Sequence, residues 1–115
     1  MTPTTHLSYF ELPVADADRA QTFYGALFGW QFADSGIPNY HMIPNAAPLA
    51  GLSAGEDSHH PHVFFTVPDI AAAAAHVVSL GGQADDPVAL PAGRFARCQD
   101  DQGTHFTLWQ DAPTS

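Results

Sequence analysis

The chain has 115 residues, with 12 Asp or Glu against three Arg and no Lys, so its formal net charge is −9. A protein that binds a nucleic-acid backbone or an anionic membrane surface needs a basic face, and three arginines cannot supply one. Hydrophobic residues make up 45% of the chain, which is enough to form an ordinary core and argues against disorder.

Neither a membrane helix nor a secretion signal is predicted. No run approaches the roughly 20 apolar residues that a membrane helix needs, and the N-terminus lacks a basic segment followed by an apolar one. We therefore expect a cytoplasmic protein. The single cysteine, Cys98, cannot form an internal disulfide, and its place in a strand-like run predicts a small buried residue.

An internal repeat organises the chain. When the sequence is shifted by 53 residues, LPVADADRAQTFYGALFG aligns with FTVPDIAAAAAHVVSLGG, which brings Val14 onto Val67 and Asp16 onto Asp69. Each copy has a strand-like run, an aspartate suited to cap a helix, an apolar stripe at helical spacing and a closing glycine. The chain is therefore predicted to contain two similar modules.

Module one is predicted to span residues 6–54. Its first strand covers His6–Val14 and ends at Pro13, and its helix begins after Asp16 and stops at Gly29 in a left-handed conformation. Turn signals then separate three short strands, which are predicted at residues 30–33, 40–43 and 49–54.

Module two is predicted to span residues 62–110, after a polar linker at residues 55–61. A strand at 62–67 precedes a helix that Asp69 caps and that ends near Gly81 and Gly82. Three further strands are predicted at residues 83–89, 93–99 and 104–110. Each module thus reads as βαβββ.

The predicted fold class is α+β. Two tandem βαβββ modules would form one domain over residues 1–115, with a cupped mixed sheet around a central cavity and the helices outside. A half of about 50 residues is marginal alone, so the modules are expected to pair and share that cavity.

The ordered motifs FELPVADADRAQTFYGALFGW, VFFTVPDIAAAAAHVVSLGG and RFARCQDDQGTHFTLWQ resemble the vicinal oxygen chelate superfamily, which includes glyoxalase I, bleomycin-resistance proteins and extradiol dioxygenases. The resemblance covers nearly the whole chain and implies the paired-module fold. It also implies a homodimer.

Enzymes of that family chelate a divalent metal with residues from four strands, usually His or Gln on the first strand of each module and Glu on the last. The resemblance assigns the first-strand positions to Tyr9 and His62 and the last-strand position of module two to Thr107. In module one the register is open, and residues 51–53 contain no carboxylate. Only His62 is therefore a good ligand for metals such as zinc, nickel or manganese.

A compensating site could use inward neighbours of these positions. Glu11 shares a strand face with Tyr9, and His105 shares one with Thr107. His62 with Tyr9, Glu11 or His105 is therefore the alternative metal set, and no metal is expected to be obligatory. Adjacent His59 and His60 lie in the polar linker and are interpreted as surface residues.

Ring-bearing side chains dominate the predicted cavity, a composition that suits a planar organic ligand. Phe10, Phe65 and Phe106 alternate to the other face and are expected under the helices. Two choices stay open. On the strand at residues 40–43, either Tyr40 with Met42 or His41 with Ile43 faces the cavity. On the strand at residues 93–99, at most one of Arg94 and Arg97 faces it. The predicted cavity residues are Tyr9, His62, Phe64, His105, Thr107 and Trp109.

Three functional hypotheses follow. The first is a glyoxalase- or bleomycin-resistance-like protein that sequesters or senses a small organic ligand, with a degenerate metal site. The second is a divalent-metal-dependent lyase, isomerase or dioxygenase. The third is a metal-free acid/base enzyme that uses Glu11, whose pKa an apolar cavity would raise.

Overall fold

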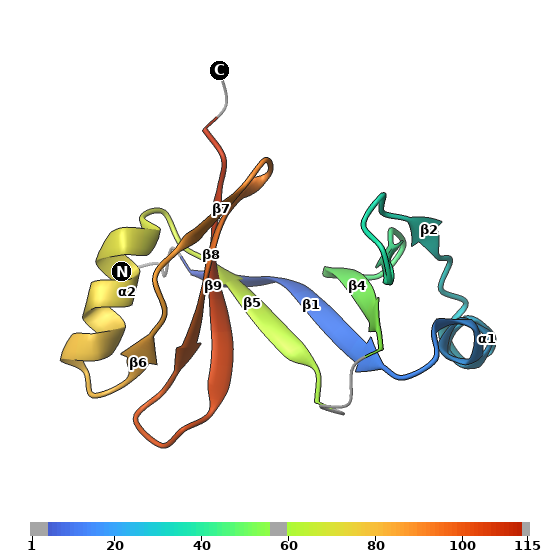
Figure 1. Ribbon diagram of the computed structural model, residues 1–115, viewed down its shortest axis with the longest axis horizontal. Coiled ribbons are helices and arrows are strands. Elements are labelled where there is room, and N and C mark those ends of the chain that lie inside the picture. The colour runs from blue at the N-terminus through green and yellow to red at the C-terminus, as the bar shows by residue number, and fades with distance from the viewer. Residues whose placement is uncertain (1–4, 56–59, 114–115) are drawn as a thin grey trace. The chain divides into compact units, whose positions relative to one another are not determined.

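The computed structural model describes residues 5–55 and 60–113, and its secondary structure is α+β (Figure 1). Neither helix in those ranges is long and apolar enough to span a membrane. The elements are β1 (His6–Val14), α1 (Ala17–Phe28), β2 (Ala33–Asp34), β3 (Tyr40–Ile43), β4 (Leu49–Ala54), β5 (His62–Thr66), α2 (Ile70–Ser79), β6 (Gln83–Ala84), β7 (Val88–Leu90), β8 (Gly93–Gln99) and β9 (His105–Asp111).

The chain divides into two compact units. The first unit is Tyr9–His62, and the second unit combines Met1–Ser8 with Val63–Ser115. Strand β1 therefore contributes to both: its first residues belong to the second unit, where the Ser8 and Thr66 hydroxyls are hydrogen bonded at 2.6 Å. Of the predicted linker 55–61, residues 56–59 lie outside the described residues.

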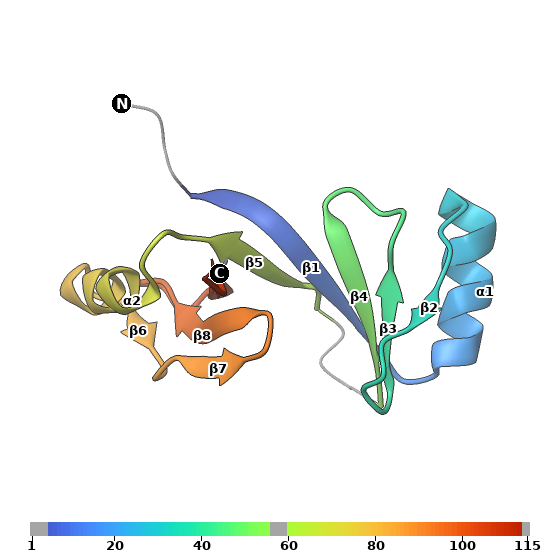
Figure 2. The same ribbon diagram turned by 90° about the horizontal axis from the view of Figure 1, so that it is seen from above.

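The strand order confirms the repeat. In the first unit the order is β2-β3-β4-β1, with β4 and β1 parallel and the other pairs antiparallel. The second unit has the order β6-β8-β9-β5, with β9 and β5 parallel, and β7 also pairs with β8. The sheet is thus mixed, and the same sequence of pairings occurs twice. Figure 2 shows strands β1 to β4 of the first unit together with helix α1.

Both helices begin as the repeat predicts. The side chain of Asp16 accepts a hydrogen bond of 3.1 Å from the backbone N–H of Arg19, and Asp69 accepts an equal one from Ala72. Each bond satisfies one of the free N–H groups of a first turn. Helix α1 ends at Gly29, whose φ of 70° is the left-handed conformation predicted for it.

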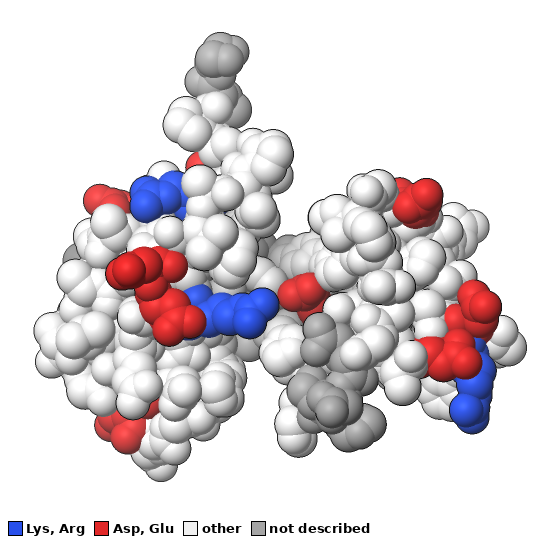
Figure 3. Space-filling view, in the orientation of Figure 1, with Lys and Arg blue, Asp and Glu red and all other residues white. Residues whose placement is uncertain are grey.

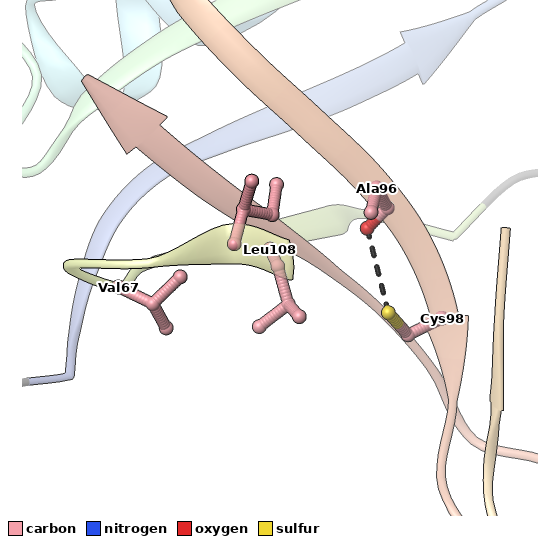
Figure 4. Close-up of a cluster of buried hydrophobic side chains, with 5 residues drawn as sticks. Val67, Ala96, Cys98 and Leu108 are labelled. Atoms are coloured by element: carbon pink, nitrogen blue, oxygen red, sulfur yellow. Dashed lines mark hydrogen bonds between the residues drawn. The ribbon is translucent and has the colours of Figure 1, made fainter. Parts of the chain in front are cut away.

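The core of the second unit lies between its strands and α2. Val67, Ile70, Ala96, Cys98 and Leu108 are buried there, and four of them are labelled in Figure 4. The Cys98 thiol donates a 3.5 Å hydrogen bond to the Ala96 carbonyl, and burial raises its pKa. This confirms the buried position predicted for Cys98.

The core of the first unit is smaller and its periphery is aromatic. Ile43, Ala46 and Ala50 are buried, with Phe10, Trp30 and Phe32 packed against them. The Trp30 ring also stacks on Tyr24 of α1 at a centroid distance of 5.7 Å. The predicted helix-side positions of Phe10 and Phe106 are confirmed, since Phe106 packs on the other core.

The first short strand of module one lies later than predicted. Residues 30–33 were expected to form it, but β2 is Ala33–Asp34. Trp30 and Phe32 instead pack into the core, and the backbone N–H of Gln31 donates to the Asn45 side chain at 2.8 Å. Packing and a side-chain acceptor thus replace the strand ladder at this point.

The run predicted as one strand at residues 83–89 is two strands, β6 and β7. Ala84 pairs with Cys98 and Val88 pairs with Phe95. The three residues 85–87 between these pairs therefore lie opposite only two residues of β8, 96 and 97. The extra residue makes a bulge, and Pro87 cannot donate to the ladder there.

Three predicted strand ends shift by a residue. Strand β5 stops at Thr66 and β9 runs from His105 to Asp111, against predicted ranges of 62–67 and 104–110. Pro13 does not end β1, because β1 continues to Val14 with Pro13 paired to Ser53 of β4.

Candidate functional site

The face of the first unit that carries Tyr9 is built by three strands. The register places Glu11 of β1 opposite Gly51 of β4, and Gly51 opposite Met42 of β3. Tyr40, two residues before Met42 on β3, pairs with Ser53 of β4. Of the two arrangements left open for β3, the structure therefore has Tyr40 and Met42 on the Tyr9 face, with Ile43 fully buried in the core on the other.

Two tyrosine hydroxyls meet over Gly51. Tyr9 Oη and Tyr40 Oη are hydrogen bonded, and Tyr9 also donates to the Met42 sulfur at 3.6 Å. A Cβ atom at residue 51 would collide with both hydroxyls, because the tyrosines occupy the space that a side chain there would need. Glycine is thus required for this tyrosine pair to form.

The tyrosine pair is held in its neutral form. Burial raises the pKa of Tyr40, and its hydrogen bond to Tyr9 and the nearby Glu11 raise it further. Burial also raises the pKa of Tyr9, while the Tyr40 hydroxyl lowers it and Glu11 raises it. At neutral pH the group therefore offers two phenol hydroxyls beside the half-buried Glu11 side chain.

The second unit presents a different face. Leu108 and Phe106 of β9 point to the α2 core, so His105, Thr107 and Trp109 share the opposite side. Thr107 lies opposite Phe64 of β5 and Arg97 of β8. The choice between the two arginines is thereby resolved: Arg97 lies on this face and Arg94 on the other.

The Trp109 ring lies close to Gly93 of β8 on this face. Its indole Nε1 donates to Asp111 at 2.8 Å, and a Cβ atom at Gly93 would lie 2.7 Å from the ring atom Cζ2. Gly93 therefore allows the ring to rest on the neighbouring strand.

The register also identifies the fourth family position. The 53-residue repeat places Glu11 on Phe64, and their strand partners are Gly51 and Thr107. Gly51 is therefore the equivalent of Thr107 in module one. The resemblance would thus assign its four ligand positions to Tyr9, Gly51, His62 and Thr107.

These residues do not fit the divalent metal of the family. Gly51 has no side chain, the Tyr9 hydroxyl is engaged by Tyr40, and a neutral threonine replaces a carboxylate. Within residues 5–55 and 60–113, no three His, Cys, Asp or Glu side chains gather in a group that could hold a metal. The alternative set of His62 with Tyr9, Glu11 or His105 stays a prediction.

The predicted site residues separate as follows. Tyr9 and Glu11 are adjacent on one face of the first unit, while Phe64, His105, Thr107 and Trp109 share one face of the second; His62 is the last residue of the first unit. Sequence reasoning missed Gly51 and left Tyr40, Met42 and Arg97 open. Strand alternation could place those three only once the register was known.

Comparisons with known proteins agree with this architecture. A family model described as bleomycin resistance protein-like N-terminal matches residues 7–43. The candidate glyoxylase CFP32 of Mycobacterium bovis is 32% identical over 124 aligned positions, which cover 96% of this chain and 46% of that protein. This chain thus spans about half the length of the curated relatives it matches.

Solved structures share the fold at low identity. Methylmalonyl-CoA epimerase from Mycobacterium tuberculosis superposes with a TM-score of 0.68 at 19% identity, covering 98% of this chain and 94% of the epimerase. A hypothetical protein, BH1468, from Bacillus halodurans gives a TM-score of 0.72 at 12% identity, covering 98% and 99%. With the duplicated βαβββ topology, these solved structures show that the chain has the same fold, and the matches agree with its resemblance to the vicinal oxygen chelate superfamily.

Proposed function

We propose that this protein binds a small organic molecule without a metal ion. The observation that carries the proposal is the tyrosine pair over Gly51. The two hydroxyls fill the space that a ligand side chain at residue 51 would need, and Tyr9, at another ligand position, is hydrogen bonded to Tyr40. With Thr107 at a third position, only His62 keeps a usual donor. A metal ion needs several donors converging on one point.

The first unit offers polar groups for ligand recognition. The Tyr9 and Tyr40 hydroxyls and the Glu11 carboxylate are grouped on one sheet face, and the phenols stay protonated. A ligand with a basic or hydrogen-bond-donating group matches Glu11, and the net charge of −9 disfavours ligands that carry several negative charges.

A ligand screen tests the proposal. Protein purified without a His-tag and treated with a chelator is screened by thermal shift against a broad set of small aromatic compounds. We expect one or more compounds to raise the melting temperature in the presence of the chelator. The proposal fails if no compound stabilises the metal-free protein and added divalent metal restores binding or turnover.

Glu11 supports a second candidate, metal-free acid/base catalysis. A half-buried carboxylate beside two neutral phenols is a suitable general base, with a phenol as a nearby hydrogen-bond donor. For any substrate that the screen identifies, Glu11→Gln should abolish turnover and leave binding within a few-fold. Asp34→Asn, at an exposed position in β2, is the matched control and should change neither.

The metal-dependent enzyme is the competing hypothesis, since a sequence relative is named as a candidate glyoxylase and proteins of similar fold are named as epimerases. Elemental analysis of untagged protein and of His62→Ala separates it from our proposal. Stoichiometric metal that His62→Ala removes would support the enzyme.

We also propose that the protein is a homodimer, which light scattering tests.

A further inference from the structure

One buried hydroxyl in the second unit has no partner. Thr107 is only 8% exposed, and within the described part of the chain its hydroxyl makes no hydrogen bond. Two other polar groups of these strands do have partners: Thr66 bonds to Ser8 at 2.6 Å, and Trp109 Nε1 donates to Asp111 at 2.8 Å. A buried hydroxyl without a protein partner is costly unless a ligand or water meets it.

A cation lies next to that hydroxyl. Arg97 is directly opposite Thr107 on β8, is exposed, and makes no ion pair with any described residue. The chain has only three positively charged side chains, and blue atoms are correspondingly few in Figure 3. A planar guanidinium beside an unpaired hydroxyl is a suitable arrangement for the two oxygens of a carboxylate.

Aromatic rings flank this pair of groups. Phe64 is opposite Thr107 on β5, and Phe95 is opposite Trp109 on β8, so the rings of three strands share the face. The hydrogen bond to Asp111 holds the Trp109 indole in place, and Gly93 leaves the space that the ring occupies. Such a surface favours a flat ring stacked or tilted against the indole.

We propose that this face binds a planar aromatic carboxylate. The ring lies against Trp109, the carboxylate pairs with the Arg97 guanidinium, and the Thr107 hydroxyl donates to one carboxylate oxygen. A monoanion is preferred over a phosphate dianion because the chain has a net charge of −9. This inference rests on the proposed function and specifies the ligand class.

The test compares 2-naphthoate with its neutral isostere, 2-naphthamide, on metal-free protein. Binding is followed in ¹H–¹⁵N spectra through the indole signals of the two tryptophans, Trp109 and Trp30. The variants are Arg97→Gln, which removes the charge, and Thr107→Val, which removes the hydroxyl at nearly constant shape. Arg94→Gln is the matched control, since it removes an exposed arginine of the same strand from the opposite face.

We expect naphthoate to bind at least about 10-fold more tightly than the amide, because only the carboxylate makes a charge-assisted hydrogen bond. Binding should shift the Trp109 indole signal but not the Trp30 signal. Arg97→Gln should abolish the preference, Thr107→Val should weaken naphthoate several-fold, and Arg94→Gln should leave both unchanged. Equal affinity of the two compounds, equal effects of Arg94→Gln and Arg97→Gln, or no binding of either overturns the inference. The proposed function fails separately, only if the wider screen finds no ligand for metal-free protein.

Discussion

The two units have the same topology but differ at equivalent positions. Where the second βαβββ module has His62 and Thr107, the first module has Tyr9 and Gly51 at the equivalent positions. In the first unit a second tyrosine occupies the space above the glycine, and the polar groups there satisfy one another. In the second unit a hydroxyl is left without a protein partner.

Under the proposed function, the two modules would depart from the metal-ligand pattern in different ways. One module has a hydrogen-bonded tyrosine pair in place of donors, and the other has a neutral polar side chain in place of a carboxylate. The caps and strand pairings stayed alike in both units, because they determine the fold rather than the site. The predictions below test how far that separation holds.

The largest effects are expected from the two cores. Ile70 of the second unit and Leu52 of the first are both fully buried, so Ile70→Ala and Leu52→Ala should each lower the free energy of unfolding by about 2–5 kcal/mol. Ile37→Ala, at a residue 61% exposed, should change it by less than about 0.5 kcal/mol. Urea denaturation measures all three. A core substitution as mild as the control would mean that its unit is not packed as described.

A side chain at residue 51 should disrupt the tyrosine pair. Gly51→Ala introduces a Cβ where two hydroxyls lie and should cost about 1–3 kcal/mol of unfolding free energy. Adding Tyr40→Ala makes room, so the double variant should lose less than the sum of the two single variants. Gly25→Ala, in the middle of α1 with its nearest neighbour at 3.5 Å, is the control and should not destabilise. Additive losses would argue against contact between residues 51 and 40.

High pH should destabilise the first unit through its tyrosines. The pKa values of Tyr9 and Tyr40 are raised in the folded protein from an ordinary value of 10.0, so the unfolded chain loses these protons first. Stability is therefore complete below pH 10 and should fall above it, by up to about 1.4 kcal/mol per pH unit for each tyrosine.

Unfolding in urea between pH 8 and 11 measures that slope. The double variant Tyr9→Phe with Tyr40→Phe should flatten it, whereas Tyr24→Phe keeps both buried hydroxyls and should retain it. A slope that survives the double variant would assign the alkaline sensitivity to other groups.

Much of the fold was predictable because the determinants are local. Asp16, Asp69 and Gly29 act through their own backbone neighbours, and the 53-residue repeat aligns them without any knowledge of the sheet. The errors came where tertiary contacts decide. Trp30 left a predicted strand to stack on α1, and the residues before Val88 formed a bulge.

The candidate site was less predictable because it depends on register. Whether Tyr40 or His41 faces Tyr9 follows from the pairing of Tyr40 with Ser53, and a shift of one residue would have reversed it. Gly51 carried no sequence signal of its own, since its importance lies in the space it leaves for two side chains from other strands.

The smallest effects are expected at the helix caps, where the two units should behave alike. Asp16→Ala and Asp69→Ala each remove one hydrogen bond of 3.1 Å to a first-turn N–H, so each should cost about 1 kcal/mol. Asp34→Asn, away from both caps, serves as the control for lost charge. Thermal unfolding measures the three variants, and a difference of more than twofold between the caps would show that the repeat is not energetically equivalent.

The central claim is that ligand binding needs no metal, because three of the four family positions hold Tyr9, Gly51 and Thr107. The most direct test is isothermal titration calorimetry of the screened ligand against untagged protein, once with chelator and once with excess zinc, nickel or manganese. We predict equal affinities, within about twofold, and no stoichiometric metal in the purified protein. Binding that appears only with metal, and that His62→Ala abolishes, would contradict the claim.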